Sequence, residues 1–262
     1  MADVLLVDRT DQVATLTMNR PESLNSLSVE LKNALVATLT ELAGDPGVRA
    51  VVLTGSGRGF CVGQDLAEHI ELLQAGDPAP LRTVEEHYNP ITLAITEMAK
   101  PVIAAVNGTA AGAGASLSFA CDLRIVSDQV KFLLAFANVG LGLDSGVSWT
   151  LPRLIGSARA LELCLLAQPI TAQVAESYGL VSQLVAPDQV LPVAQELASR
   201  LAAGPTVAYA AIKHAIGYSA AHTLRESLAN EAVQQAMAGA TADHRIAVAA
   251  FVNKQKPAFT GR

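Results

Sequence analysis

One carboxylate stands alone in a stretch of glycines and apolar residues. Asp144 lies in AFANVGLGLDSGVSW, residues 135–149, and is the only acidic residue between Asp128 and Glu162. A carboxylate in apolar surroundings has a raised pKa and becomes a better general base. The same residue precedes a predicted helix, where Asp is a preferred N-cap. From the local residues alone, the helix cap is the favoured interpretation and proton transfer is the alternative.

Two glycine-containing turns follow predicted strands. The first reads GSGRGFCVGQDL, residues 55–66, and the second reads NGTAAGAGASL, residues 107–117. Glycine permits sharp bends and close backbone approach, and the run after Ala113 predicts a helix start with its positive dipole end. If both turns end near one point, their N–H groups converge on one oxygen, as in an oxyanion hole. Such a hole suits a thioester or acyl carbonyl; tight helix–strand packing is the alternative explanation.

Composition and motifs argue against several other functions. The net charge of −6 and the scattered basic residues argue against nucleic-acid binding. Neither glycine turn matches a phosphate-binding or dinucleotide-binding pattern. The three cysteines form no CxxC pair, so we expect no disulfide framework, no metal site and a reducing cytoplasm. The start of the chain has no signal-peptide pattern.

An uncharged run spans residues 101–121 and contains a GxxxG pattern. That pattern is typical of packed membrane helices. The run, however, opens on Pro101, contains Asn107 and is rich in Gly and Ala instead of Leu. We therefore expect no membrane span and a cytoplasmic protein.

The elements that position the two turns alternate between strands and helices. The sequence predicts an N-terminal hairpin, then a helix with four leucines on one face that ends at Gly44-Asp45-Pro46. The leucines are Leu31, Leu35, Leu39 and Leu42, and the further strands are expected at residues 49–54, 102–106, 122–127 and 180–185. This alternation indicates an α/β fold with crossover helices.

After about residue 187 the pattern becomes almost entirely helical. We expect a strand-rich core with the acyl site over residues 1–190 and a helical region over residues 191–262. Thr223 and Glu226 predict a capping box, and Gly204-Pro205 and Gly217 are expected to divide the helices. Only 16% of the residues are charged, so other subunits are expected to cover part of the surface.

Five segments, in their order and spacing, carry a resemblance to a known family. They are MNRPESLNSLS from Met18, VVLTGSGRGFCVGQDL from Val51, PVIAAVNGTAAGAGASLSFACDLRIVS from Pro101, GVSWTLPRLIG from Gly146 and the ending FTGR. Across essentially its whole length the chain resembles the crotonase (enoyl-CoA hydratase/isomerase) superfamily. The resemblance implies a spiral core of ββα units with C-terminal helices, and a homotrimer or dimer of trimers. It also implies an acyl-CoA thioester substrate and no separate cofactor, since coenzyme A belongs to the substrate.

The resemblance also implies roles for individual residues. The N–H groups of Gln64 and Ala113 would form the oxyanion hole. Residues expected along the CoA arm and the acyl pocket are Arg20, Ser23, Leu24, Val62, Asp65, Leu66, Phe136 and Trp149. Trp149 has packing in the core as its alternative role.

The chain departs from the family pattern at both hydratase glutamates, whose positions hold Ser116 and Phe136. Neither side chain titrates in a useful range. Asp144 instead falls in the turn where isomerase members carry their acid, among them the ring-epoxide isomerases of phenylacetyl-CoA breakdown. The resemblance thus implies an acyl-CoA isomerase with a single Asp proton shuttle. An enoyl-CoA hydratase and a non-catalytic acyl-CoA binder are the alternatives.

Other residues with chemical side chains have simpler explanations. Glu68 and His69 are expected on a solvated helix face, and Glu85 and Glu86 on the surface beyond a loop at residues 74–83. Cys61 is expected to be a small packing residue.

Overall fold

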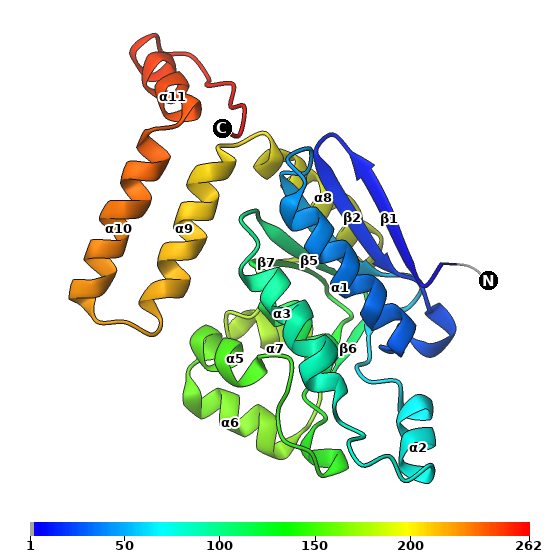
Figure 1. Cartoon of the computed structure of the whole chain (residues 1–262). Coiled ribbons are helices and arrows are strands. Elements are labelled where there is room, and N and C mark those ends of the chain that lie inside the picture. Colours follow the sequence, from blue (N-terminus) through cyan, green and yellow to red (C-terminus); the bar gives the residue numbers. More distant parts are fainter. Residues whose placement is uncertain (1–2) are drawn as a thin grey trace.

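Two sheets build the core of the protein in the computed structural model, which describes residues 3–262 (Figure 1). The larger sheet has the strand order β1-β2-β3-β5-β7-β10, and the smaller has the order β4-β6-β8-β9. The strands are β1 (Leu5–Thr10), β2 (Val13–Met18), β3 (Ala50–Gly55), β4 (Gly59–Cys61), β5 (Val102–Val106), β6 (Thr109–Ala111), β7 (Leu123–Ser127), β8 (Lys131–Leu133), β9 (Ile170–Thr171) and β10 (Gln183–Val185).

The helices follow the strands in a repeating order. They are α1 (Val29–Gly44), α2 (Leu66–Gln74), α3 (Asn89–Thr96), α4 (Ala113–Ala120), α5 (Val147–Ile155), α6 (Ser157–Leu166), α7 (Ala172–Ser177), α8 (Val190–Ala202), α9 (Thr206–Ser219), α10 (Leu224–Gly239) and α11 (Ala242–Val252). Short 3₁₀ turns lie at Pro21–Ser23, Ala137–Val139 and Pro187–Gln189, and a π-helical turn lies at Val84–Tyr88.

The repeating unit is two strands and a helix, one strand going to each sheet. The units β3–β4–α2, β5–β6–α4 and β7–β8–α5 each follow this pattern. The predicted hairpin is confirmed, since β1 and β2 pair antiparallel, and the later neighbours in the large sheet are parallel. The α/β prediction with a ββα spiral core is therefore confirmed.

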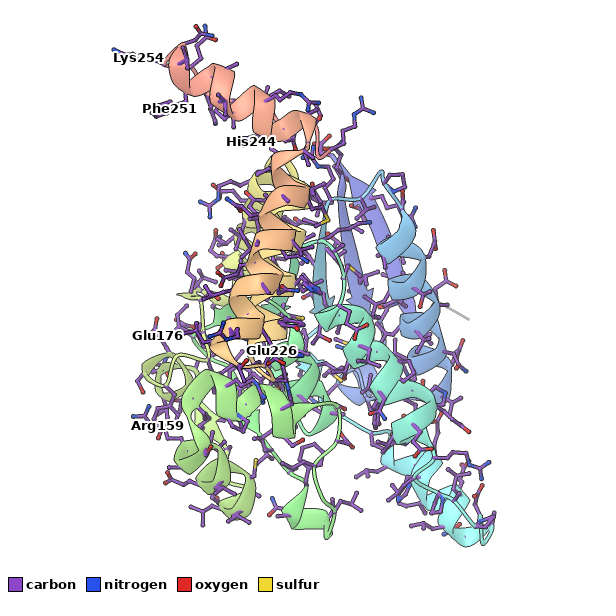
Figure 2. All side chains as sticks on the ribbon, turned by 60° about the vertical axis from the view of Figure 1, so that its left-hand side comes forward. Arg159, Glu176, Glu226, His244, Phe251 and Lys254 are labelled. Atoms are coloured by element: carbon purple, nitrogen blue, oxygen red, sulfur yellow. The ribbon has the colours of Figure 1, made fainter. Side chains whose placement is uncertain are left out.

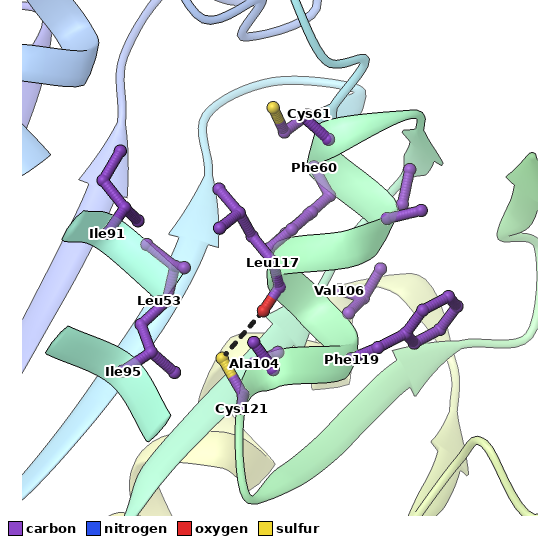
Figure 3. Close-up of a cluster of buried hydrophobic side chains, with 14 of the residues drawn as sticks. Leu53, Phe60, Cys61, Ile91, Ile95, Ala104, Val106, Leu117, Phe119 and Cys121 are labelled. Carbon is purple, nitrogen blue, oxygen red and sulfur yellow. Dashed lines mark hydrogen bonds between the residues drawn. The ribbon is translucent and has the colours of Figure 1, made fainter. Parts of the chain in front are cut away.

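Helices cover both faces of the large sheet. On one face lies α1, whose buried side chains include the four predicted leucines. Ile91 and Ile95 of α3 and Leu117 of α4 extend this cluster (Figure 3). Helix α8 packs against the other face through small residues such as Ala194 and Ala198. The strands between these layers carry apolar side chains on both faces, which explains why VIAAV is wholly buried.

Two local expectations need correction. Strand β10 covers only Gln183–Val185, so the first half of the predicted strand at residues 180–185 is not extended. Gly217 lies inside α9, and the break comes after Ser219 instead, because the helix tolerates one glycine where tertiary contacts hold it. The uncharged run at residues 101–121 folds as β5, β6 and α4. Within residues 3–262, no helix combines the length and apolar character needed to cross a membrane.

The C-terminal helices project from the core. Helices α9 and α10 lie side by side next to the core, and α11 follows beyond the end of α10 (Figure 1). The predicted capping box of Thr223 and Glu226 begins α10. Figure 2 shows α11 beyond the core with Phe251 and Lys254 near its end, and Phe251 is 85% exposed. Helix α8 packs on the sheet, although the expected division after residue 190 assigns it to the helical region. That division, and a role of the helical region in trimerisation, stay predictions.

Candidate active site

The two glycine turns touch each other at the carboxyl ends of β4 and β6. Gly63 has a φ of +87°, and a Cβ at this position would lie 3.1 Å from the Ala111 carbonyl oxygen and 3.2 Å from the Ala113 nitrogen. A Cβ at Gly114 would lie 2.1 Å from the Cys61 carbonyl oxygen. Figure 3 shows Cys61 against this helix. Only glycine therefore permits the two backbones to meet here.

Two main-chain N–H groups at this junction have no acceptor among the residues that the structure describes. Ala113 is the first residue of α4, and such an N–H has no partner inside its own helix. Gln64 forms a parallel bridge with Leu27 in which Gly63 accepts and Asp65 donates, so the Gln64 N–H is left out of the pairing. Over residues 3–262, neither N–H donates to another protein group. The helix dipole adds positive potential at Ala113.

Both residues line one cavity of about 140 Å³, and so does Asp144. Its other lining residues are Val62, Gly63, Leu66, His69, Leu81, Thr83, Val84, Tyr88, Gly112, Ala135, Phe136, Val139 and Leu141. The lining of this mainly apolar space thus includes one carboxylate and the two residues whose N–H groups have no acceptor among the described residues. This arrangement has the parts needed to bind a carbonyl oxygen and to move a proton beside it.

Asp144 lies in the turn before α5, and its side chain does not cap that helix. The N-cap is Gly146, with a φ of +71° and no side-chain cap, whereas Asp144 contributes only its carbonyl to the Val147 N–H. The carboxylate instead accepts a hydrogen bond from Ser145 Oγ at 2.8 Å. The N-cap interpretation is therefore wrong, because the left-handed backbone at Ser145 and Gly146 separates the carboxylate from the first N–H groups of the helix.

Burial raises the pKa of the Asp144 carboxyl, and the hydrogen bond from Ser145 opposes part of that rise. Phe136, which was expected in the acyl pocket, lines the cavity and is 6% exposed, so it keeps water away from this region. Tyr88 lies close enough that the Asp144 charge adds to the effect of burial in raising the pKa of the phenol. Asp144 thus occupies the environment expected for a general base.

The residues expected along the CoA arm fall into two groups. Val62 and Leu66 line the cavity beside Gln64. Arg20 and Asp65 pair with each other, with Arg20 Nη1 2.7 Å from Asp65 Oδ2. Asp65 also caps α2 by accepting hydrogen bonds from two N–H groups of its first turn. This ion pair has a structural role at the N-terminus of α2.

Ser23 and Leu24 belong to the short turn that precedes α1. Ser23 Oγ donates to the Arg20 carbonyl at 3.1 Å. Leu24 has a φ of +52° and packs against Gly59, next to the first glycine turn. Both lie outside the cavity that Asp144 lines.

Trp149 lies outside that cavity, contrary to its expected place in the acyl pocket. Helix α5 buries Val147, Thr150 and Leu151, so Trp149 faces away from the packed side and is 43% exposed. Its ring stacks on the Arg153 guanidinium at 4.1 Å. It borders two larger grooves, of about 570 and 900 Å³, between the core and α9.

The structure adds residues that the sequence did not assign to the site. His69 lines the cavity, and its Nδ1 is buried without a hydrogen-bond partner among the described residues. Its spacing of three residues from Leu66 on α2 is the signal that places both on one face. Glu68 instead accepts a hydrogen bond from the Val29 N–H at 2.8 Å and helps to begin α1. Neither residue lies on a freely solvated face.

The positions of the hydratase glutamates supply no carboxylate here. Ser116 is wholly buried and donates to the Gly112 carbonyl at 3.0 Å. Phe136 forms part of the cavity wall. Asp144 is the sole carboxylate among the described residues that line the cavity. Glu85 and Glu86 are exposed, and Cys61 is wholly buried with a pKa raised by burial to about 12, which keeps the thiol neutral.

Comparisons with known proteins agree with this architecture. The family model for enoyl-CoA hydratase/isomerase matches residues 8–262. The 1,2-epoxyphenylacetyl-CoA isomerase of Escherichia coli is 41% identical over all of both chains, and a probable enoyl-CoA hydratase of Rhodobacter capsulatus is 41% identical over 97% of this chain and 96% of its own. The crystal structure of an enoyl-CoA hydratase from Bacillus anthracis superposes with a TM-score of 0.92 at 32% identity, covering 99% of this chain and 100% of the other. The chain therefore belongs to the enoyl-CoA hydratase/isomerase family.

Proposed function

We propose that the protein is an isomerase of acyl-CoA thioesters that works with Asp144 as its single proton shuttle. The observation that supports this proposal is the shared cavity: its lining includes one desolvated carboxylate and two residues whose main-chain N–H groups have no acceptor within residues 3–262. The absence of a second carboxylate from the described lining residues favours isomerisation over the addition of water.

The proposed reaction begins with the thioester oxygen between the N–H groups of Gln64 and Ala113. These donors stabilise the enolate that forms when Asp144 removes a proton from the α or γ carbon. Asp144 then returns the proton at the other end of the delocalised system. The net result is migration of a double bond, or ring rearrangement when the acyl group is an arene epoxide, and no atom is gained or lost.

The size of the cavity supports a ring-sized or short acyl group. A dry cavity of about 150 Å³ accommodates one benzene molecule, and the cavity at Asp144 has about 140 Å³. Tyr88 and Phe136 provide aromatic walls. The relative from Escherichia coli that isomerises 1,2-epoxyphenylacetyl-CoA supports the same choice.

Hydration is the second candidate, supported by the relatives named enoyl-CoA hydratase. A panel of 3-enoyl-, 2-enoyl- and arene-epoxide acyl-CoA esters, with products identified by mass spectrometry, separates the candidates. Products of unchanged mass support isomerisation, and products heavier by one water support hydration. Binding of the panel without any turnover would leave an acyl-CoA binder and overturn the proposal.

Assembly and location follow as further proposals. Apolar side chains on the projecting helices remain exposed, among them Ile216 at 68% and Phe251 at 85%. Burial of such faces in a homotrimer or a dimer of trimers would remove them from water. Light scattering tests this assembly. A cytoplasmic location and a role in phenylacetate breakdown belong to the same proposal.

A further inference from the structure

A lysine side chain is buried next to the candidate oxyanion hole without a carboxylate partner. Lys32 of α1 has no exposed surface. Its Nζ donates to Thr83 Oγ1 at 2.7 Å and to Gln64 Oε1 at 3.3 Å. Within residues 3–262, no carboxylate oxygen lies within 4.0 Å of this Nζ. The cation is therefore held by neutral oxygens and by the face of the Tyr88 ring, whose centroid lies 5.5 Å from Nζ.

Such a cation is costly for the fold. A buried charge without a counter-ion loses its hydration, and an apolar side chain of similar volume at such a site is often neutral or stabilising. Desolvation lowers the pKa of Lys32, while the more distant charges of Glu68 and Asp65 oppose the change. The core of α1 is otherwise leucine, and a methionine would fill the same space. Packing alone does not explain a lysine here.

The hydrogen bonds of the Gln64 side chain connect Lys32 to the candidate oxyanion hole. Gln64 Oε1 accepts hydrogen bonds from both Lys32 Nζ and the Tyr88 hydroxyl, so its side chain is held from two elements. The main-chain N–H of the same residue is one of the two proposed donors of the oxyanion hole, and Gln64 lines the cavity. Tyr88 and Thr83 belong to the cavity wall, whereas Lys32 lies behind it.

We propose that Lys32 is a positioning residue: through Gln64 Oε1 it holds the Gln64 N–H in place for the thioester oxygen, and its charge favours the enolate. This inference rests on the proposed oxyanion hole. It predicts that Lys32 matters more for the transition state than for substrate affinity, because the enolate carries the charge that the ground-state carbonyl lacks.

The test variant is Lys32→Met, which removes the charge while Gln64 Oε1 keeps a second hydrogen-bond donor. Thr83 Oγ1 keeps His87 Nδ1 at 3.1 Å, and Gln64 Oε1 keeps the Tyr88 hydroxyl. The matched control is Lys100→Met, since Lys100 is also buried but donates to the carbonyls of Leu42 and Asp45, away from the cavity. Tyr88→Phe removes the second donor to Gln64 and decides the question if Lys32→Met does not fold.

The readout is the carbonyl stretch of bound phenylacetyl-CoA labelled with ¹³C at the thioester carbon, measured by isotope-edited infrared difference spectroscopy. This ester cannot isomerise, so the measurement does not depend on turnover. In the parent protein, hydrogen bonds from the hole are expected to lower the stretch relative to free ester. Lys32→Met is expected to lose part of this shift and about tenfold in kcat, with KM and melting temperature nearly unchanged. Lys100→Met is expected to keep the shift.

The outcomes separate the two proposals. A full shift and parental kcat in a folded Lys32→Met variant, or in Tyr88→Phe if the lysine variant does not fold, overturns the positioning role alone. A parent protein that binds the ester without any shift lacks the hole and overturns the proposed function as well. A parent protein that shows the shift but isomerises none of the acyl-CoA esters overturns the proposed reaction. The variants then still decide whether Lys32 helps to polarise the carbonyl.

Discussion

Ser145 donates a hydrogen bond from Oγ to Oδ1 of Asp144 at 2.8 Å, from a wholly buried position with a φ of +50°. A left-handed conformation is uncommon for serine. It directs the hydroxyl back to the preceding carboxylate and leaves the capping of α5 to Gly146. The local backbone thus determines whether Asp144 caps a helix or faces the cavity.

Asp144→Asn is expected to lower isomerase kcat by about 10²–10⁴-fold, the usual contribution of a general acid–base group. The amide keeps the shape of the carboxylate but cannot accept the proton. Affinity for phenylacetyl-CoA should be retained, because the proposed carbonyl donors are main-chain groups. Steady-state kinetics and calorimetric titration check both parts, with Asp128→Asn as the surface control. Parental turnover in Asp144→Asn would exclude the shuttle.

Ser145→Ala is expected to move the acid limb of the kcat/KM profile to higher pH. Burial raises the pKa of Asp144 and the Ser145 hydroxyl counteracts it, so removal of that hydroxyl raises the pKa further. A general base works only when ionised, hence the activity falls at a higher pH as acid is added. Ser118→Ala is the control, since Ser118 is buried in α4 and bonds to the Ala115 carbonyl. An unshifted limb would mean that another group sets it.

The melting temperature of Asp144→Asn should exceed that of the parent at pH 7, and the difference should shrink towards pH 4. The folded state raises the pKa of Asp144 above its ordinary value of about 3.9. The Asp144 carboxyl therefore stabilises the folded state at a pH below the ordinary pKa. This contribution is lost as the pH rises through the folded-state pKa, because the buried group then becomes charged. Thermal melts across this range measure the difference. A parent more stable than the variant at pH 7 contradicts the prediction.

Hydration of crotonyl-CoA is expected to be slow compared with isomerisation of a preferred substrate. Water must be both held and deprotonated, and the cavity offers one carboxylate because Ser116 is buried and Phe136 is apolar. Loss of the conjugated-thioester absorbance measures hydration directly. Hydration faster than isomerisation across the substrate panel would favour the hydratase.

Much of the fold could be predicted because it depends on short-range pattern. The spacing of Leu31, Leu35, Leu39 and Leu42 predicts the buried face of α1, and the apolar runs predict β3 and β5. The two turns predict a convergence only if they end near one point, and the assignment of Gln64 and Ala113 as the donors depends on the resemblance. These patterns and motifs are contained within single segments.

What the sequence did not predict depends on contacts between distant segments. Lys32, Gln64 and Thr83 come from three elements, and only the folded chain brings their polar atoms together. Trp149 lies outside the cavity instead of in the acyl pocket, because its direction depends on which face of α5 packs against the core. The residue types favour a helix N-cap at Asp144, because they do not reveal the left-handed backbone at Ser145 and Gly146.

Two helical glycines test whether close backbone contact holds the site together. By helix propensity alone, Gly→Ala stabilises a helix interior by about 0.5–1 kcal/mol. Gly217→Ala in α9 should follow that rule, because a Cβ there meets nothing within 4 Å. Gly114→Ala in α4 should do the opposite, because its Cβ would lie 2.1 Å from the Cys61 carbonyl oxygen and force the two turns apart.

The cost expected for Gly114→Ala is about 1–3 kcal/mol or more, as for other overpacked sites. Separation of the turns also moves the Gln64 and Ala113 N–H groups away from a common oxygen, so the infrared shift of bound phenylacetyl-CoA should shrink. Urea unfolding of both variants, with the shift measured on whatever remains folded, compares the two glycines directly. A Gly114→Ala variant as stable as Gly217→Ala, with an unchanged carbonyl shift, would show that the turns do not need this contact to form the hole.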